Sequence, residues 1–328
     1  MVSYKIIKYS PFYKSLWNDF NEICHNSSFL FNRNYIEYHY DKFQDYSLLI
    51  FDNEELKAIL PGNIVNNSYY SHQGLTYGGL AYNKETKLLD IIRIFYHILK
   101  YLHQQNINLI YYKCLPKIYN LLPSDEMDWV LFKLSAVSYR RDCSLSILNS
   151  NPVPFQNRRL RLIKKAAKLN PIILEEKKPG IEKFWCEILE PNLLTKFGVK
   201  PVHSINEILY LMNKFPTNIK HFNIYEGRNL MAGTTIYINN NVAHAQYISG
   251  NENGRKNGFL DYLFSYLITN TFKDFKYFDF GICNENAGRD LNIGLLEWKE
   301  GFGARTIIHD FYEIKTENYQ FLNTFCVN

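Results

Sequence analysis

The sequence predicts an α+β protein of two tandem units, each a mixed, mostly antiparallel sheet flanked by helices. Three observations support this prediction: a strand and helix pattern that occurs twice, a basic segment with prolines between the two copies, and a glycine-rich turn before a helix in the second copy. With 328 residues the chain is long enough for two units, each with its own core. We expect an active-site cleft between or beside these units.

The repeated pattern has the order β-β-β-α-β, and its two copies are offset by roughly 170 residues. Each copy consists of a hairpin, a further strand, a helix that opens with Leu-Asp, and a strand that ends in Cys. In the first copy these elements are expected at residues 48–67, 69–79, 88–105 and 107–114. In the second copy they are expected at residues 221–241, 242–250, 259–272 and 275–283. The conserved order favours a duplication over a chance similarity of apolar strands.

The predicted domain division follows from this repeat. We assign residues 1–150 to the N-terminal unit, 151–178 to a junction and 179–328 to the C-terminal unit. The junction contains Pro152 and Pro154, and basic residues then recur at helical spacing at positions 158, 161, 165 and 168. This pattern predicts a short basic helix, with either a solvated face or an anion site beside an interdomain cleft.

Composition excludes several classes of protein. A net charge of +5 is too small for a surface that wraps nucleic acid, so no nucleic-acid partner is expected. The first residues lack an apolar signal region, and no run of 18 uncharged apolar residues occurs, so we expect a cytoplasmic protein without a membrane partner. The six cysteines are scattered without a C-x-x-C pair, which indicates reduced thiols and no metal site.

The stretch "YISGNENGRKNGFLDYLFSYLI", residues 247–268, joins an apolar strand to an amphipathic helix through a glycine-rich basic turn. Backbone N–H groups at a helix start, the positive end of the helix dipole, and Arg255 with Lys256 all favour an anion such as a diphosphate. The spacing matches neither a P-loop nor a Rossmann motif, which disfavours an NTPase or a dehydrogenase. A plain flexible turn is the alternative.

Three segments carry a family resemblance. The segment 277–305 contains Asp279-Phe280-Gly281 at a strand end and then "WKEGFG" at 298–303, and it resembles the closing segment of FemAB-like proteins. The segments "IKKAAK" (163–168) and "YRRDCSLSIL" (139–148) also resemble FemAB-type sequence. The chain therefore resembles the FemAB-like double-GNAT N-acyltransferases over nearly its whole length, which implies two GNAT-like units with an acyl-CoA site in the C-terminal one.

This resemblance implies transfer of an acyl group to an amine. One branch of the family uses aminoacyl-tRNA to extend peptidoglycan bridges, often with a long helical arm, and we find no such arm in the sequence. The other branch contains nucleotide-sugar N-acyltransferases, which place 3-hydroxybutyryl from CoA on the amine of dTDP-3-amino-3,6-dideoxygalactose. We favour the second branch, with acyl-CoA as co-substrate, a nucleotide-linked amino sugar as partner, and a role in the synthesis of a cell-surface polysaccharide such as O-antigen or capsule. A FemX-like, aminoacyl-tRNA-dependent transferase acting on a peptidoglycan precursor is the alternative.

The resemblance also implies a set of donor-site residues. The strand before the turn would line the pantetheine arm and the thioester with its backbone, and the turn would hold the CoA diphosphate. Asn284 and Asn286 would reach the same arm, although turn chemistry accounts for them equally well. The predicted donor-site residues of the strand and turn are Tyr247, Ile248, Ser249, Gly250, Asn251, Arg255, Asn257 and Gly258.

Three residues are candidates for the catalytic base. His72 lies at a strand-to-turn position, His244 alternates with Gln246 on the strand before the glycine turn, and Glu226 lies in a hairpin turn. An ordinary hydrogen-bonded role for either histidine, and solvent exposure for the glutamate, are the simpler explanations. An enzyme without a dedicated base is a further alternative, because a sugar amine can lose its proton to water before it binds.

For the nucleotide sugar, we expect arginines to meet the diphosphate and aromatic rings to stack on the pyrimidine. The candidates are Arg158, Arg161, Arg33, Phe31, Tyr70 and Tyr77. Two functions from other classes stay open, namely a binding protein whose thioester site is inactive and an RNA-binding module that uses "RRLRLIKKAAK". The sequence does not decide the acyl chain, the nucleotide, the base or whether the chain forms a homodimer.

Overall fold

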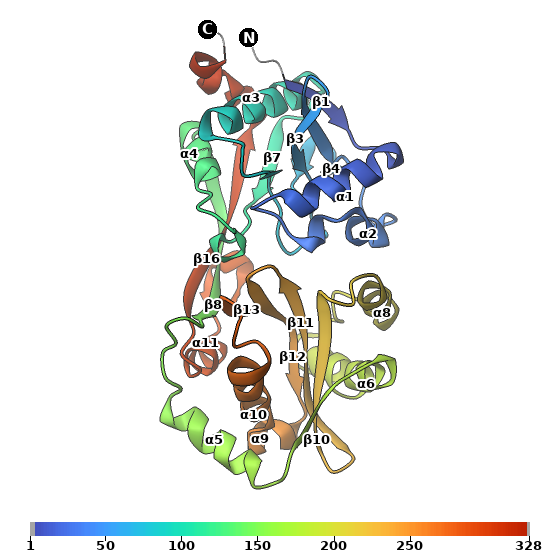
Figure 1. Ribbon diagram of the computed structural model, residues 1–328, viewed down its shortest axis with the longest axis vertical. Helices are drawn as coiled ribbons and strands as arrows, with labels where there is room; N and C mark the ends of the chain where they lie inside the picture. The colour runs from blue at the N-terminus through green and yellow to red at the C-terminus, as the bar shows by residue number, and fades with distance from the viewer. Residues whose placement is uncertain (1–3, 327–328) are drawn as a thin grey trace. The chain divides into compact units, whose positions relative to one another are not determined.

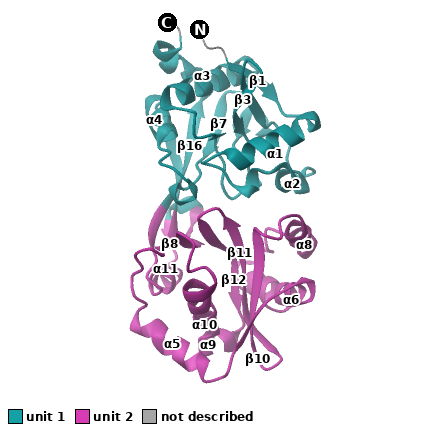
Figure 2. Ribbon diagram, viewed as in Figure 1, with its two compact units in different colours: residues 1–142, 287–289, 308–328 teal, residues 143–286, 290–307 magenta. Residues whose placement is uncertain are grey.

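The computed structural model describes residues 4–326 and divides into two compact units (Figures 1 and 2). Unit 1 comprises residues 1–142, 287–289 and 308–328, and unit 2 comprises residues 143–286 and 290–307. Strand β8 (Val137–Leu148) begins in unit 1 and ends in unit 2, whereas β16 (Arg305–Lys315) begins in unit 2 and ends in unit 1. The predicted division placed residues 308–326 in the second unit. Residues 308–326 belong to unit 1 because β16 pairs with β7 (Leu109–Lys113).

Unit 1 contains the first copy of the repeat. Its α-helices are α1 (Lys14–Ile23), α2 (Arg33–Ile36), α3 (Leu88–Gln104) and α4 (Glu126–Lys133). Its short 3-10 helices are η1 (Pro11–Tyr13), η2 (Phe29–Phe31), η3 (Glu37–His39), η4 (Lys117–Tyr119) and η8 (Thr316–Phe325). Its other strands are β1 (Tyr4–Lys8), β2 (Leu48–Asp52), β3 (Glu55–Leu60), β4 (Asn63–Val65), β5 (Ser68–Tyr70) and β6 (Ala81–Tyr82).

The strands of unit 1 form two sheets, in the orders β1-β2-β3-β6 and β4-β5-β7-β16. The predicted hairpin over 48–67 is confirmed as β2 and β3, and the predicted helix is confirmed as α3, whose apolar face buries Ile91, Phe95 and Leu99 against the sheets. The predicted strand over 69–79 is largely wrong. It ends at Tyr70 because His72 at φ +54° and Gly79 at φ +102° do not fit an extended strand.

Unit 2 contains the second copy. Its helices and helical turns are α5 (Asn157–Ala167), α6 (Lys178–Phe184), η5 (Trp185–Leu189), α7 (Glu190–Phe197), α8 (Ile205–Lys214), α9 (Glu252–Asn257), α10 (Phe259–Tyr266), η6 (Leu267–Thr271) and α11 (Ile293–Glu300). A short η7 turn (Asn286–Gly288) lies at its boundary with unit 1. Its other strands are β9 (Ile172–Glu175), β10 (Ile219–Glu226), β11 (Asn229–Asn239), β12 (Val242–Gly250), β13 (Tyr277–Ile282), β14 (Asn284–Glu285) and β15 (Asp290–Leu291).

The main sheet of unit 2 has the order β8-β13-β12-β11-β10-β9 and is antiparallel except between β12 and β13. The predicted hairpin, strands, helix over 259–272 and basic junction helix are all confirmed, the last as α5. One sheet face packs Ile236 and Ala245 against Phe264 of α10, and the other brings Trp185 against Tyr247. In both units a strand that precedes the repeated helix pairs in parallel with the strand that follows it, β5 with β7 and β12 with β13.

Strand β12 leaves its parallel neighbour after the first third of its length. It pairs with β13 only over Val242–His244, whereas its pairing with β11 continues to Gly250. A β-bulge lies at the divergence, because Ala245 faces Ile236 and Tyr247 faces Thr235, which leaves Gln246 as the extra residue. Within the described ladder, the edge of β12 from residue 245 to residue 250 therefore has no strand on its β13 side.

The glycine-rich turn is more ordered than the sequence predicts, because residues 252–257 form the short helix α9. Asn251 caps this helix by accepting a hydrogen bond from Gly254 N–H at 2.7 Å. A Cβ atom at Gly254 would lie 2.2 Å from Met231 O, and one at Gly258, where φ is +79°, would lie 2.5 Å from Leu162 O. These two glycines therefore permit close packing against β11 and α5.

This packing predicts that Gly258→Ala destabilises the protein more than Gly198→Ala does. Both glycines have positive φ, but a Cβ at Gly198 would have no atom within 4 Å. We expect about 1 kcal/mol for Gly198→Ala from backbone strain and roughly 1–3 kcal/mol more for Gly258→Ala from overpacking. Urea denaturation of the two variants measures the difference, and equal losses would contradict this account of Gly258.

Candidate functional site

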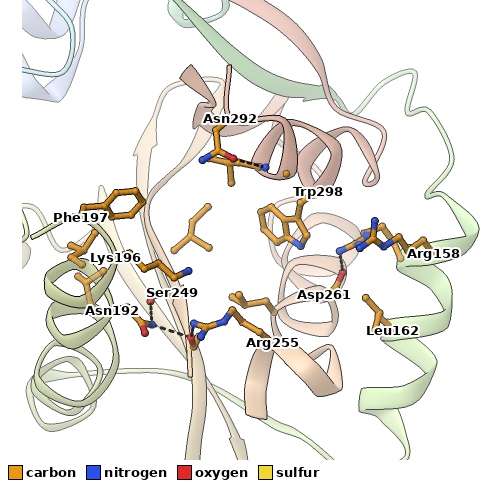
Figure 3. Close-up of a pocket in the computed structure, with 18 residues that line it drawn as sticks. Arg158, Leu162, Asn192, Lys196, Phe197, Ser249, Arg255, Asp261, Asn292 and Trp298 are labelled. Carbon is orange, nitrogen blue, oxygen red and sulfur yellow. Dashed lines mark hydrogen bonds and ion pairs between the residues drawn. The ribbon is translucent and has the colours of Figure 1, made fainter. Parts of the chain in front are cut away.

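A pocket of about 540 Å³ lies in unit 2 along the open edge of β12 (Figure 3). Ile248, Ser249 and Gly250 of this strand line it directly. The remaining lining residues come from α5, η5, α7, α9, α10, α11 and the N-cap of α11. The volume is in the range of sites for small molecules and cofactors.

Helix α7 forms one wall of the pocket and is attached to β12 by a side-chain amide. Asn192 Nδ2 donates to Ser249 Oγ at 2.8 Å and to Gly250 O at 3.0 Å. Leu193, Lys196 and Phe197 of the same helix also line the pocket. The sequence analysis did not identify α7 as part of the site, because its residues match no motif and lie far from the glycine-rich turn in the chain.

Basic side chains dominate the charge of the pocket. Four cationic side chains line it, from Arg158, Arg159, Lys196 and Arg255, against one carboxylate, Asp261. Arg255 Nη1 donates to Gly250 O, so this guanidinium lies at the end of the open strand edge. Leu260, Leu295 and Trp298 are among the apolar lining residues. The pocket therefore suits a ligand with an anionic group and an apolar part.

A buried ion pair joins α5 to α10 at the side of this pocket. Arg159 Nη1 contacts Asp261 Oδ1, and only 6% and 5% of the two side chains are exposed. Burial raises the pKa of Asp261 above its usual value, although Arg159 counteracts that effect. The sequence analysis singled out Arg158 and Arg161 and missed Arg159, since helical spacing alone does not tell which arginine of "NRRLR" faces inward. Arg158 is exposed and lines the pocket, and Arg161 is exposed and donates to Asn157 O.

A second buried polar group surrounds the last parallel pair of β12 and β13. His244 Nδ1 lies 2.7 Å from Asp279 Oδ2, and Ser144 Oγ donates to Asp279 Oδ1 at 2.9 Å. Burial would raise the pKa of Asp279, but hydrogen bonds from His244, Ser144 and Gly281 N–H hold it below its usual value. The carboxylate therefore stays ionised and fixes the histidine ring.

Lys299 is the third buried polar group of unit 2. Its Nζ donates to Gly281 O at 2.9 Å and to Ile282 O at 2.7 Å, and the residue is 2% exposed. Burial lowers the pKa of Lys299 to about 8. The sequence analysis quoted this lysine within "WKEGFG" but gave it no role, and the structure makes it the anchor of the segment that follows Asp279.

The predicted donor-site residues fall into two groups. Ile248, Ser249, Gly250 and Arg255 line the pocket. The others have structural contacts. Tyr247 is buried with its OH 2.5 Å from His203 Nδ1, Asn251 caps α9, partly buried Asn257 is the last residue of α9, and Gly258 packs against Leu162. Asn284 Oδ1 accepts a hydrogen bond from Cys143 N–H at 2.6 Å, and exposed Asn286 donates a hydrogen bond to Asp290.

The remaining predicted residues lie away from the lining of this pocket. Glu226 is partly buried at the end of β10. The others are in unit 1. Phe31 is fully buried, and Arg33 is 1% exposed and forms ion pairs with Asp45 and Glu37. Tyr77 forms a hydrogen bond with Tyr119, Tyr70 stacks on Tyr111, and His72 is buried beside His39. Burial lowers the pKa of His72 well below its usual value. These contacts give Phe31 and Arg33 structural roles in the core of unit 1.

The Arg159–Asp261 pair leads to a prediction about stability. Arg159→Met leaves a buried carboxylate without its partner, and we expect a loss of about 3–5 kcal/mol in the free energy of unfolding. Arg161→Met, on the exposed face of the same helix, is the matched control and should change it by less than about 0.5 kcal/mol. The double variant Arg159→Met/Asp261→Leu should recover much of the loss. Urea denaturation tests this, and equal effects of the two arginine variants would contradict it.

The buried Lys299 leads to a prediction about pH. Its pKa of about 8 in the folded protein lies below the ordinary value of 10.5, so the unfolded chain binds more protons between these pH values. Stability should therefore rise with pH across this window. We expect the free energy of unfolding of the wild type, relative to Lys299→Met, to increase from pH 8 to pH 10.5. Other titrating groups contribute equally to the wild type and to Lys299→Met, so their effects cancel in the difference between the two. A difference that does not change with pH would show that the pKa of Lys299 is unshifted in the folded protein.

Comparison with known proteins places the fold. No protein-family model matches the sequence, and no curated protein matches it. Among solved structures, FemX superposes with a TM-score of 0.63 at 10% identity, covering 93% of this chain and 96% of that one. A conserved protein of unknown function from Bacteroides thetaiotaomicron gives 0.57 at 10% identity, covering 96% and 100%. A tandem GNAT protein from the clavulanic acid biosynthesis pathway gives 0.51 at 8% identity, covering 96% and 99%.

These identities are low, and the likeness is one of fold. No helix within residues 4–326 is long and apolar enough to cross a membrane. The chain has the fold of FemX and of the tandem GNAT protein, which confirms the two-unit α+β architecture predicted from its sequence.

Proposed function

We propose that this chain is an acyl-CoA-dependent N-acyltransferase that moves a short acyl group, such as 3-hydroxybutyryl, to the amine of a dTDP-linked amino sugar. The observation that carries the proposal is the free edge of β12 along a pocket with a basic lining. An extended pantetheine arm has amide groups that can pair with a free strand edge as an added strand would. The acceptor is taken from the family resemblance.

In this proposal the donor lies along residues 247–250, with its phosphates near Arg255 and Lys196 and its apolar part against Trp298. The amine of the acceptor attacks the thioester carbonyl carbon, the C–S bond breaks, and CoA leaves as the thiol after it takes up the proton released by the amine. His244 is our candidate for moving that proton, because Asp279 holds its Nδ1 at 2.7 Å and fixes the ring.

A second candidate function uses aminoacyl-tRNA as donor and a peptidoglycan precursor as acceptor. The observation that favours it is the packing of Gly254 in α9 against Met231 and of Gly258, directly after α9, against Leu162, which gives both glycines a structural reason other than a bound diphosphate. A donor without the CoA diphosphate would not need an open glycine turn at this position.

A thermal-shift scan with CoA, acetyl-CoA, 3-hydroxybutyryl-CoA, dTDP, UDP and charged tRNA separates these candidates. A ligand at about a hundred times its dissociation constant adds roughly 2.7 kcal/mol of stability. Stabilisation by the CoA compounds and by dTDP supports the first proposal. A response to charged tRNA, with none to any CoA compound, would replace it with the second.

Arg255 provides a sharper test of the donor site. We expect Arg255→Ala to weaken CoA binding about tenfold, since it removes a charge-assisted contact that contributes about 1.4 kcal/mol. Lys256→Ala is the matched control, because Lys256 is the next residue, equally basic and exposed, and absent from the pocket lining of the described chain. Isothermal titration at constant salt measures both dissociation constants. Equal effects of the two variants would show that net charge, rather than this pocket, attracts CoA.

A further inference from the structure

Two cysteines lie side by side in unit 2, far apart in the chain. Cys143 is in β8, and Cys283 directly follows β13. Because Ile282 faces Ser144 in this antiparallel pair, Cys283 faces Cys143 at the next position. Cys283 N–H donates to Cys143 O at 2.9 Å, and Cys283 Sγ lies 3.4 Å from the same oxygen.

Facing positions on paired antiparallel strands are the positions that a cross-strand disulfide joins. Residues that face each other in an antiparallel pair have Cα atoms about 4.5–5.5 Å apart, which is within the range of disulfide-linked cysteines. Cys283 is 1% exposed, whereas Cys143 is partly exposed and reaches Thr306 Oγ1 at 3.7 Å. One thiol of the pair is therefore open to small oxidants, and the other is protected behind it.

The surroundings of the pair include the buried ammonium of Lys299. Burial is the main cause that raises the pKa of Cys283 to about 12, and the neighbouring Cys143 thiol adds to this rise. The positive charge of Lys299 opposes it. Lys299 interacts electrostatically with both thiols and donates to the carbonyl groups of Gly281 and Ile282, directly before Cys283. The ammonium therefore offsets only part of the effect of burial on the Cys283 thiol, which stays protonated at neutral pH.

We propose that Cys143 and Cys283 form a reversible redox site, which peroxide converts to a disulfide. The Cys143 sulfur attacks one peroxide oxygen, the O–O bond breaks, and water leaves with the thiol proton, which gives a sulfenic acid. The Cys283 sulfur then attacks the Cys143 sulfur, the S–O bond breaks, and the hydroxyl group leaves as a second water with the Cys283 proton. Peroxide is reduced, the two thiols are oxidised, and an added dithiol restores them.

Oxidation at this site acts on a wall of the pocket. Cys283 O accepts a hydrogen bond from Asn292 N–H at 2.8 Å, and Asn292 caps α11, which carries Leu295 and Trp298 into the pocket lining. The disulfide would tie the base of α11 to β8 and reduce its motion. Any effect on donor binding rests on the proposed function, whereas the disulfide and the stiffening of α11 do not.

The test treats the full-length protein with hydrogen peroxide, alkylates the remaining thiols and maps the peptides by mass spectrometry. We expect a linked peptide pair containing Cys143 and Cys283, loss of two of the six free thiols, and recovery of both with dithiothreitol. Cys143→Ser and Cys283→Ser should each abolish the link. Cys186→Ser, which removes an exposed cysteine elsewhere in unit 2, is the control and should leave the link intact.

Hydrogen exchange of residues 292–300 supplies a second measurement that needs no ligand. We expect slower exchange in the oxidised wild type than in the reduced form, and no difference between the two conditions in Cys283→Ser. Oxidation of Cys143 to sulfinic acid without a link, or a link between other cysteines, would overturn the proposed site. Equal exchange rates in the linked and reduced forms would overturn its effect on α11.

Discussion

The structure of unit 2 depends on how the backbone of β13 is satisfied after it separates from β12. Beyond Asp279, side chains replace the parallel ladder: Asp279 accepts from Gly281 N–H at 3.2 Å, and Lys299 Nζ donates to Gly281 O and Ile282 O. Buried backbone groups without partners would cost too much free energy to be tolerated. Because side chains satisfy these backbone groups in place of the ladder, the two strands can diverge, and the divergence leaves β12 with a free edge.

The elements around that edge are held by specific contacts. Helix α7 is attached through Asn192, and α5 is locked to α10 by the buried pair of Arg159 and Asp261. Gly258 allows the start of α10 to approach Leu162 of α5 within a distance that a side chain would prevent. The basic helix that the sequence placed in a domain junction therefore becomes part of the pocket wall.

Three buried polar residues of unit 2, His244, Asp279 and Lys299, surround the same backbone segment. Gly281 is bonded by Asp279 through its N–H and by Lys299 through its carbonyl group, and a Cβ atom at this position would lie 3.1 Å from His244 Cε1. Lys299 also acts electrostatically on Cys143 and Cys283. One short segment, residues 279–283, therefore connects the buried pair of His244 and Asp279 to the two cysteines.

The sequence by itself determined the duplicated order of strands and helices, because the 2-residue and 3.6-residue periods of apolar side chains are local properties. The family resemblance also pointed to Ile248, Ser249, Gly250 and Arg255, which line the pocket, whereas Arg158, which was expected to meet the nucleotide sugar, lines the same pocket. Only the tertiary structure decided that Arg159 faces inward, that α7 forms a wall, and that Phe31 and Arg33 are buried. These features depend on which distant segments pack together, and neither periodicity nor spacing along the chain contains that information.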